Sequence, residues 1–311
     1  MDQLLSGLRA AGEPTRLRLL ALCAHGELSV SELVHILGQS QPRVSRHLKL
    51  LVEAGLLARH REGSLVYYRL TSRGASAELA RTLVDLLPAE DGALNLDLAR
   101  LEQVRERRAA AAEAYFRDSA RDWDQIRALH VPESEVESRL REIVGSDAVN
   151  TFLDIGTGTG RILQLFAEQV EHAVGLDNSI EMLNVARARL EQAGHRHVQL
   201  RKGDMYAMAV EDASVDLATL HLVLHYSLEP ERVVAEAART LRPGGRLIIV
   251  DFAAHGEEQL RSEHKHQRLG FSDGELRSTM QAAGLTPGST ASLAGDPLTV
   301  NIWQGTQPLL H

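Results

Sequence analysis

The N-terminal quarter of the chain alternates helical patterns with two strand-like runs. Apolar residues recur at helical spacing over 14–24. The tetrapeptide SVSE at 29–32 is typical of a capped helix start, and the helix that follows is expected to end at Gly38. Ser40 is expected to cap a third helix, and residues 57–70 predict a two-stranded hairpin. This order of elements predicts a helix-turn-helix followed by a wing.

The third helix has one apolar and one polar face. Val44, Leu48 and Leu51 are spaced to lie on its buried side. The side chains left outside are of kinds that bind base edges and phosphates: Gln41, Arg43, Ser45, Arg46, His47 and Lys49. Arg61 lies near the tip of the hairpin and is expected to contact the DNA backbone or minor groove. We therefore predict a double-stranded DNA operator as one partner.

The middle of the chain predicts long helices. Leucines stand at helical spacing over 75–87, and residues 88–95 are typical of a turn. From Leu96 to about residue 130 there is no glycine or proline, so one helix could reach about 50 Å, with a break near 117–121 left open. The charge-rich part of this stretch, 102–114, predicts a solvated spacer.

The second half of the chain alternates strand-like and helical patterns. Short apolar runs predict strands that end near Asp154, Asp177 and Asp204, with helices between them. The later elements are expected to be a strand that runs into a loop over 215–226, a strand after the LRPGG turn at 241–245, a helix over 272–283, and strands around 285–293 and 298–304. This alternation predicts a doubly wound sheet that binds ligands at the carboxyl ends of its strands.

A glycine-rich loop follows the first of these strands. The stretch TFLDIGTGTG places Gly156, Gly158 and Gly160 directly before a helix. A dinucleotide-binding loop has the spacing G-x-G-x-x-G, but Arg161 stands where its third glycine would be. A nucleoside triphosphate loop needs Gly-Lys-Ser/Thr, which is absent. The spacing favours close backbone approach to an uncharged or zwitterionic ligand.

Acidic residues follow the next two strands. Asp177 comes 23 residues after Asp154, and an acid at the end of the second strand can accept both hydroxyls of a ribose. Asp204 is placed to accept a hydrogen bond from an adenine amino group, and Met205 to cover the ring. These positions predict an adenosine-containing ligand.

The distribution of charge also divides the chain into two parts. The formal charge is -8 over 311 residues, yet the first 75 residues carry ten basic and six acidic side chains. A locally basic DNA module and an acidic remainder explain this difference. No apolar run is long enough to span a bilayer, no secretory leader is expected, and Cys23 is the single cysteine. We therefore expect a cytoplasmic protein with no membrane partner.

The first 75 residues resemble the ArsR/SmtB family of winged-helix repressors. The stretches GEPTRLRLLALC, GELSVSEL, SQPRVSRHLKLLVEAGLL and REGSLVYYRL carry the resemblance. It implies a homodimer, with the helix over 75–87 pairing with its twin. Metal sensors of that family often carry Cys-x-Cys in the helix that here contains LSVSE, and serine is a poor ligand for soft metals. No metal site is predicted.

Residues 113–306 resemble the class I S-adenosylmethionine-dependent methyltransferases, through the glycine loop, the strand-end acids and the LRPGG turn. The resemblance implies S-adenosylmethionine as cofactor and S-adenosylhomocysteine as product. It places these residues at the cofactor: Asp154, Gly156, Gly158 and Gly160 at the methionine end, Asp177 and Asn178 at the ribose, and Asp204 and Met205 at the adenine. Tyr115 and Trp123 resemble a lid segment, with core packing as the alternative.

The methyl acceptor is predicted by exclusion to be a small molecule. The stretch HLVLHY at 221–226 lacks the motif of DNA amino-methylases. Cytosine-ring methylation needs an attacking thiolate, but Cys23 lies in the other domain, and one cysteine is too few for arsenite methylation. His225 is the candidate catalytic residue, because it follows the fourth strand and can take a proton from an acceptor hydroxyl or amine. His221 is expected to point into the sheet. The run SEHKHQRLGF adds Glu263, His264 and His266 as solvated or acceptor-facing residues.

These patterns predict an α/β protein with an α+β winged helix-turn-helix domain. The predicted division is a DNA-binding domain at 1–87, a helical connector at 88–130, and a Rossmann-like, seven-stranded methyltransferase domain at 131–311. Two functions fit this arrangement. One is an ArsR-type regulator whose second domain methylates a small molecule. The other is a non-catalytic repressor that senses S-adenosylmethionine or S-adenosylhomocysteine as its effector.

Overall fold

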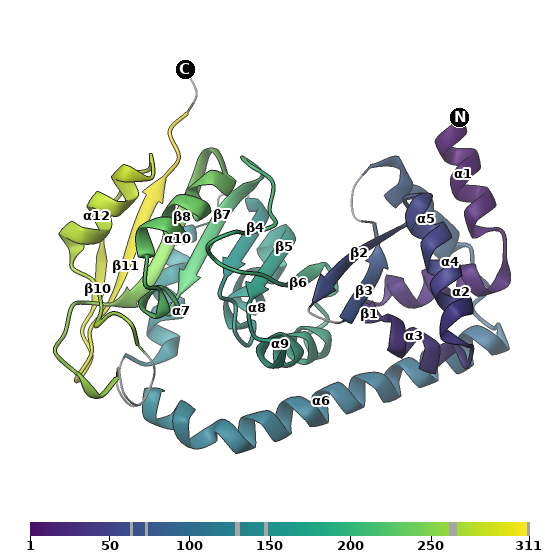
Figure 1. Cartoon of the computed structure of the whole chain (residues 1–311), viewed down its shortest axis with the longest axis horizontal. Coiled ribbons are helices and arrows are strands. Elements are labelled where there is room, and N and C mark those ends of the chain that lie inside the picture. The colour runs from purple at the N-terminus through teal and green to yellow at the C-terminus, as the bar shows by residue number, and fades with distance from the viewer. Residues whose placement is uncertain (63–64, 72–73, 128–130, 146–148, 261–265, 310–311) are drawn as a thin grey trace. The chain divides into compact units, whose positions relative to one another are not determined.

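The computed structural model describes residues 1–62, 65–71, 74–127, 131–145, 149–260 and 266–309. The chain divides into two compact units, Met1–Ala111 and Ala112–His311. The division falls within the segment that the sequence assigns to a connector. Each unit has its own hydrophobic core, and each is described by itself below (Figure 1).

The first unit is a winged helix-turn-helix, as the sequence predicts. Its three-stranded antiparallel sheet has the order β1-β3-β2. Its elements are α1 (Asp2–Ala11), α2 (Pro14–Ala24), β1 (Leu28–Ser29), α3 (Val30–Leu37), α4 (Gln41–Glu53), β2 (Leu57–Glu62), β3 (Leu65–Leu70) and α5 (Ala75–Asp85). Val44, Leu48 and Leu51 of α4 are fully buried, which confirms the predicted inner face of this helix.

Local side-chain chemistry sets the helix-turn-helix boundaries. The Ser29 hydroxyl accepts from the Glu32 backbone N–H at 3.3 Å, and the Glu32 carboxylate accepts from the Ser29 N–H at 2.8 Å. This confirms the predicted capping box. Gly38 ends α3 in the left-handed conformation, with φ of 64°. Ser40 stands at the start of α4 but makes no capping hydrogen bond, so that part of the prediction is wrong.

The long helix α6 (Gly92–Arg127) is continuous, and the break considered near 117–121 does not occur. It begins earlier than predicted, because the Asp91 carboxylate accepts from the backbone N–H groups of Ala93 and Leu94, both at 2.9 Å. The side chains of Tyr115 and Trp123 lie outside the part of the chain that the structure describes.

The N-terminal half of α6 belongs to the winged unit. Leu101 and Val104 are buried in that unit's core, at 2% and 5% exposure. Asp97 accepts two hydrogen bonds from Arg18, both at 2.6 Å. The prediction that 102–114 is a solvated spacer is therefore wrong for this half of the helix. Arg105 and Arg108 were mistaken for solvated side chains because their partners, His25 and Glu32, lie far away in the sequence.

The second unit is a doubly wound sheet. Its main path has seven strands in the order β10-β11-β8-β7-β4-β5-β6, and β9 pairs with β11. The strands are β4 (Val149–Ile155), β5 (Val170–Asp177), β6 (Val198–Lys202), β7 (Val215–His221), β8 (Leu241–Phe252), β9 (Thr286–Pro287), β10 (Ala291–Leu293) and β11 (Val300–Thr306). Strands β4 to β8 are parallel, and β11 is antiparallel to β8. The predicted Rossmann-like fold is confirmed, and the two-residue strand β9 makes the sheet eight-stranded in place of the predicted seven.

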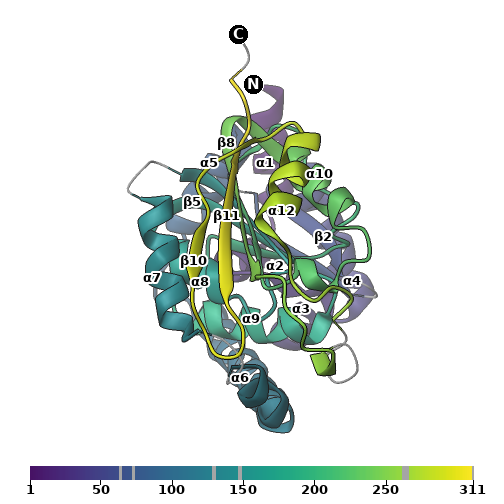
Figure 2. The same ribbon diagram turned by 90° about the vertical axis from the view of Figure 1, so that its left-hand side faces the viewer.

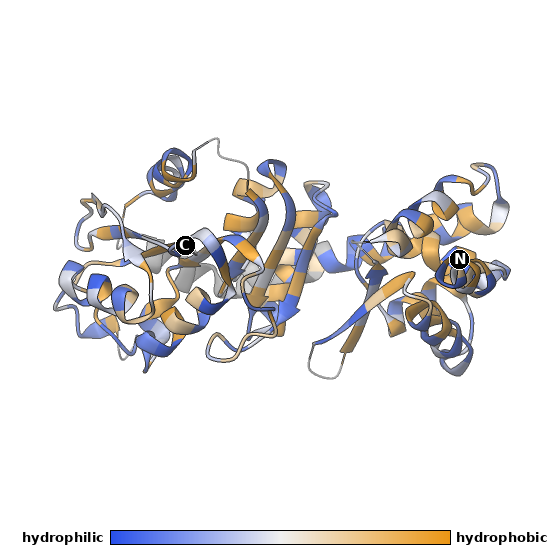
Figure 3. Ribbon diagram, turned by 90° about the horizontal axis from the view of Figure 1, so that it is seen from above, coloured by the Kyte–Doolittle hydropathy of each residue, from blue (hydrophilic) through white to orange (hydrophobic). Residues whose placement is uncertain are grey.

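Helices cover both faces of this sheet (Figure 2). The helices are α7 (Glu133–Val144), α8 (Arg161–Phe166), α9 (Ile180–Gln192), α10 (Pro230–Thr240) and α12 (Asp273–Ala282). One core cluster joins the sheet to α7, α8 and α9, and the other joins it to α10 and α12. Figure 3 shows hydrophobic residues gathered along the strands between these layers. Among the described residues, no helix is both long and apolar enough to cross a membrane.

Two details differ from the sequence prediction. The segment 285–304 forms three short strands, β9 to β11, in place of two. The fifth strand, β8, begins at Leu241 and so includes the stretch LRPGG, which was expected to be a turn before it. The fourth strand ends at His221 and runs into a loop, as predicted, and a single 3-10 turn, Leu224–Tyr226, follows it. Leu222 between them has φ of 52°, a left-handed conformation that no extended strand can contain.

Candidate functional site

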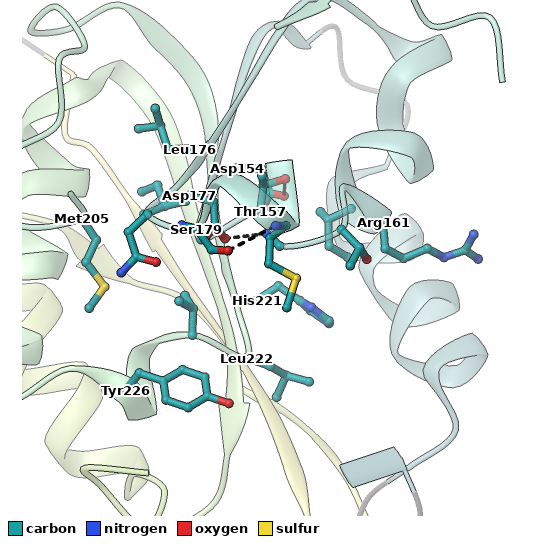
Figure 4. Close-up of a pocket in the computed structure, with 18 of the residues that line it drawn as sticks. Asp154, Thr157, Arg161, Leu176, Asp177, Ser179, Met205, His221, Leu222 and Tyr226 are labelled. Atoms are coloured by element: carbon teal, nitrogen blue, oxygen red, sulfur yellow. Dashed lines mark hydrogen bonds between the residues drawn. The ribbon is translucent and has the colours of Figure 1, made fainter. Parts of the chain in front are cut away.

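A cavity of about 1520 Å³ lies at the carboxyl ends of the parallel strands. Its lining comes from the segments that follow four of them: 154–159 after β4, 176–179 after β5, 203–206 after β6 and 221–226 after β7. The start of α7 and the end of β8 complete it. Figure 4 shows these side chains converging from separate strands. The structure thus brings together seven of the eight residues that the sequence assigned to the cofactor, and the eighth, Gly160, stands at the start of α8 and is not part of the lining.

The glycine loop is tightly constrained at Gly156 and open at Gly158. A Cβ added at Gly156 would lie 2.4 Å from Val223 Cγ2, and the residue has φ of 70°. Gly158 has φ of 52°, and a Cβ there would meet no atom within 4 Å. Gly156 is therefore required for packing, whereas Gly158 leaves room on the cavity side for a ligand.

Asp154 supports the loop from beneath. It is 1% exposed, and its two oxygens accept from the hydroxyls of Thr157 and Thr219, both at 2.6 Å. Burial raises the pKa of Asp154 to about 6, and the two hydroxyls oppose that shift. Its short hydrogen bonds hold Thr157, and with it the turn of the glycine loop.

Asp177 joins the loop to the second strand. One carboxylate oxygen accepts from Gly158 N–H and the other from Ser179 N–H, both at 2.8 Å (Figure 4). Burial raises the pKa of Asp177, while the backbone N–H groups lower it. Each oxygen keeps a further lone pair, so the carboxylate can also accept from two hydroxyl groups. Asn178 beside it is exposed.

The third strand end supplies Asp204, Met205 and Tyr206. Asp204 is exposed, and it accepts from the Tyr206 backbone N–H at 3.0 Å. Met205 is half-buried at the cavity wall (Figure 4). The Tyr206 hydroxyl is 2.8 Å from the hydroxyl of Ser227, which fixes this rim against the segment after β7.

The opposite end of the cavity holds a buried histidine. His225 is 2% exposed, and its Nδ1 lies 2.8 Å from the carboxylate of Asp251, which is fully buried. Its ring stacks on His266, with centroids 4.1 Å apart. His221, expected to point into the sheet, lines the cavity instead (Figure 4). Glu263 and His264 lie outside the described residues.

Sequence reasoning missed Asp251 and did not single out the role of His266. Asp251 stands near the carboxyl end of β8, the fifth strand of the second unit. Ligand-binding residues are expected at such strand ends, and the reasoning that identified Asp154 and Asp177 would also have identified Asp251. The pairing of His266 with His225 has no local signal, because it joins two loops far apart in the sequence.

The candidate DNA-binding residues lie mostly on the outer face of α4. Four of them are exposed: Gln41, Arg43, Arg46 and Lys49. Ser45 is half-buried, and Arg61 is exposed on β2. The His47 side chain is only 14% exposed, and its Nδ1 is 3.7 Å from the carboxylate of Glu13. This helix face therefore presents two arginines, a lysine and an amide.

Comparison with known proteins matches both units. Residues 13–59 match the family model for bacterial regulatory proteins of the arsR family. Residues 153–249 match the model for the methyltransferase domain. The chain thus carries an ArsR-family helix-turn-helix domain and a methyltransferase domain.

Individual relatives align with parts of the chain. An uncharacterized 37.1 kDa protein in transposon TN4556 of Streptomyces fradiae is 40% identical over 100 residues, which are 31% of this chain and 28% of that protein. The uncharacterized methyltransferase YcgJ of Bacillus subtilis is 31% identical over 107 residues, which are 34% of this chain and 42% of that protein. The chain spans less than half the length of either relative.

A solved structure supports the fold of the second unit. A Bacillus halodurans C-125 protein, provisionally assigned as a methyltransferase, superposes with a TM-score of 0.50 at 20% identity. The match covers 55% of this chain and 98% of that one. At this identity the likeness concerns the fold.

Proposed function

We propose that this chain is a DNA-binding transcriptional regulator whose methyltransferase domain binds S-adenosylmethionine and methylates a small molecule. The observation that carries the proposal is the strand-end cavity. It combines an open glycine at Gly158 with a carboxylate, Asp177, that holds the loop and keeps lone pairs for hydroxyl groups. A methyltransferase domain match covers the same strands.

The residues present fit this cofactor. The space beside Gly158 admits a ligand against bare backbone, and Asp177 can accept from both ribose hydroxyls. Asp204 and Met205 suit an adenine, as an exposed acceptor and an apolar wall. When bound, the cofactor would supply an electrophilic methyl group on a sulfonium. The chain would contribute mainly positioning and the exclusion of water, which account for much of the rate in such displacements.

The DNA-binding role rests on α4. Its exposed arginines suit phosphates and guanine edges, and its buried leucines fix the helix on the unit's core. The charge difference between the two halves of the sequence supports the same division of roles, because an acidic cofactor domain is repelled by phosphates.

The proposed assembly is a homodimer. Leu4, Leu5 and Leu8 on α1 are 47%, 40% and 44% exposed, which is an apolar face that water disfavours. A second copy of this unit would cover it. The family resemblance also implies a homodimer, but through the helix over 75–87. Sedimentation of the full chain and of a Leu4→Glu, Leu8→Glu variant tests this assembly, with a monomeric variant expected.

A second candidate function, a non-catalytic sensor of S-adenosylmethionine or S-adenosylhomocysteine, is favoured by α6. This helix is bound to the helix-turn-helix by arginine side chains and continues past residue 111. Such a helix can carry a change in the methyltransferase domain to the DNA-binding helices.

Fluorescence anisotropy with DNA from upstream of the chain's own gene tests the proposal and separates the candidates. Affinity is measured without ligand, with S-adenosylmethionine and with S-adenosylhomocysteine. Tight DNA binding that neither ligand alters supports an enzyme fused to a repressor. A tenfold shift, which is about 1.4 kcal/mol of coupling, supports the sensor. No specific DNA binding in any condition contradicts both.

A further inference from the structure

We propose that Asp251 holds His225 with its proton on Nδ1, so that Nε2 takes the proton from a hydroxyl group of the methyl acceptor. Asp251 is thus a positioning residue for His225, and the acceptor class is a neutral, apolar molecule that carries a hydroxyl. This inference rests on the proposed methyltransferase function and names the substrate class for the same cavity.

The geometry fixes the two edges of the His225 ring differently. Nδ1 lies 2.8 Å from Asp251 Oδ1, and a carboxylate can only accept, so Nδ1 carries the proton. In a neutral imidazole Nε2 then has a free lone pair. Nε2 is buried and has no hydrogen-bond partner among the described residues, although the ring lines the cavity. A buried acceptor without a donor is costly, and a ligand hydroxyl would satisfy it.

Several hydrogen bonds hold the Asp251 carboxylate in this position. Its Oδ1 also accepts from Phe252 N–H at 2.8 Å, and its Oδ2 accepts from His225 N–H at 3.1 Å. Three N–H groups therefore point at one carboxylate that is fully buried. An asparagine cannot accept all three, because its NH₂ group must face at least one of these donors.

The cavity wall around His225 indicates an uncharged acceptor. The neighbouring lining residues are apolar or aromatic: Leu222, Val223, Tyr226, Phe252 and His266. Of the two arginines elsewhere in the lining, Arg161 is paired with the Glu137 carboxylate, and Arg189 donates to the Thr159 hydroxyl in the glycine loop. No lysine lines the cavity among the described residues. The wall around His225 therefore offers no arginine or lysine to an anionic acceptor, whereas an apolar molecule with one hydroxyl fits it.

Transfer of the hydroxyl proton to His225 accompanies transfer of the methyl group to the hydroxyl oxygen. His225 Nε2 takes the hydroxyl proton as the oxygen–methyl bond forms and the methyl–sulfur bond breaks. Sulfur keeps the electron pair of the broken bond and becomes an uncharged thioether. The positive charge passes to the His225 imidazolium, which Asp251 stabilises until water removes the proton.

Nuclear magnetic resonance of the full chain tests this arrangement directly. Long-range proton–nitrogen spectra distinguish the two tautomers, and a His225→Gln variant identifies the His225 signals among the 14 histidines. In the neutral ring, we expect Nδ1 protonated and Nε2 unprotonated. With S-adenosylhomocysteine present, para-fluorophenol should shift the Nε2 resonance. Para-fluoroanisole, which has a methoxy group in place of the hydroxyl, should not shift it.

An Asp251→Asn variant should populate the opposite tautomer and lose the response to para-fluorophenol, while its affinity for S-adenosylhomocysteine stays within twofold. Asp216→Asn is the matched control. Asp216 also accepts backbone N–H groups, from Asn150 and Thr151, and it accepts from the Arg242 side chain, but these partners do not line the cavity. This control should behave as the unmodified chain does.

Two results overturn the inference: a proton on Nε2 in the unmodified chain, or no response of Nε2 to para-fluorophenol. Both are measured without the Asp251→Asn variant, so the test survives if that variant does not fold. Calorimetry with S-adenosylhomocysteine is run in parallel. A failure to bind it would contradict the proposed function, whereas the tautomer is measured without the cofactor.

Discussion

The guanidinium of Arg108 on α6 makes two hydrogen bonds to the carboxylate of Glu32 on α3, at 2.9 and 2.8 Å. The same guanidinium donates to the backbone carbonyl of Glu27 at 3.1 Å. Glu32 also closes the capping box at Ser29, so one carboxylate connects the start of α3 to the long helix. Burial raises the pKa of Glu32 and Arg108 lowers it, and the net shift is downward.

Replacing Arg108 should therefore loosen α3. Arg108→Ala leaves Glu32 half-buried without its cation, which costs about 1 to 3 kcal/mol of local stability. Hydrogen exchange of α3 backbone amides measures this change. Arg139→Ala is the control, because Arg139 makes an exposed pair with Glu142 that contributes less than about 0.5 kcal/mol. Equal exchange in both variants would show that the α6 contact does not support α3.

Asp177→Ala should abolish cofactor binding in a protein that remains folded. The variant loses the acceptor for ribose hydroxyls and the hydrogen bond that holds Gly158 N–H. We expect S-adenosylhomocysteine affinity to fall at least tenfold, or about 1.4 kcal/mol, by calorimetry. Circular dichroism serves as the folding control. An unchanged Kd would refute the assignment of this strand end to the ribose.

Substitution of the two loop glycines should have different effects, on stability at Gly156 and on cofactor affinity at Gly158. Gly156→Ala drives a Cβ to 2.4 Å from Val223, so thermal unfolding should occur at a clearly lower temperature. Gly158→Ala meets no atom of the chain and pays only the left-handed strain of about 1 to 2 kcal/mol. Its Cβ instead occupies ligand space, so it should lose cofactor affinity. Wild-type affinity in folded Gly158→Ala would place the ligand elsewhere.

Arg46→Ala should weaken DNA binding and leave cofactor affinity in the absence of DNA unchanged. Arg46 is exposed on the outer face of α4, and loss of an arginine contact costs about 1 to 3 kcal/mol. Anisotropy at several salt concentrations also separates a phosphate contact, which reduces the salt slope, from a base contact. Arg139→Ala again provides a surface-arginine control. Undiminished DNA affinity in Arg46→Ala would contradict the role of α4.

Asp154 should make stability depend on pH in an unusual direction. Its pKa is about 6 in the folded protein, against about 3.9 in an unfolded chain. The folded state therefore binds the proton more tightly. The stabilising contribution is complete below about pH 4 and is lost as pH rises through about 6. Relative to Asp154→Asn, the unmodified chain should lose stability on the order of 3 kcal/mol between these limits. Urea unfolding of both proteins measures this difference, and a constant difference would contradict it.

Local patterns predicted most of the fold. The capping box at Ser29, the left-handed end of α3 at Gly38 and the glycine loop at Gly156 depend on neighbours within a few residues. Strand ends followed from apolar runs, so the sequence placed Asp154, Asp177 and Asp204 at one edge of the sheet, where they line the same cavity. The strands β9 and β10, which are short and carry few apolar residues, were divided wrongly.

Contacts between segments that are far apart in the chain were not predicted from the sequence. Arg108 and Glu32 are 76 residues apart, so the arginines of α6 seemed solvent-exposed when taken alone. His225 was found as a single residue, whereas its partner Asp251 lies on the next strand of the sheet. Helical periodicity identifies an apolar face, but it does not show which surface a charged face meets.

Equilibrium dialysis of labelled S-adenosylmethionine against the full chain tests the central claim most directly. The account predicts saturable binding at one site per chain. S-adenosylhomocysteine should displace the label, whereas ATP and NAD should not, because the glycine spacing lacks both of their loop motifs. Absence of saturable binding, or equal displacement by ATP, would contradict the claim that the second unit is an S-adenosylmethionine site.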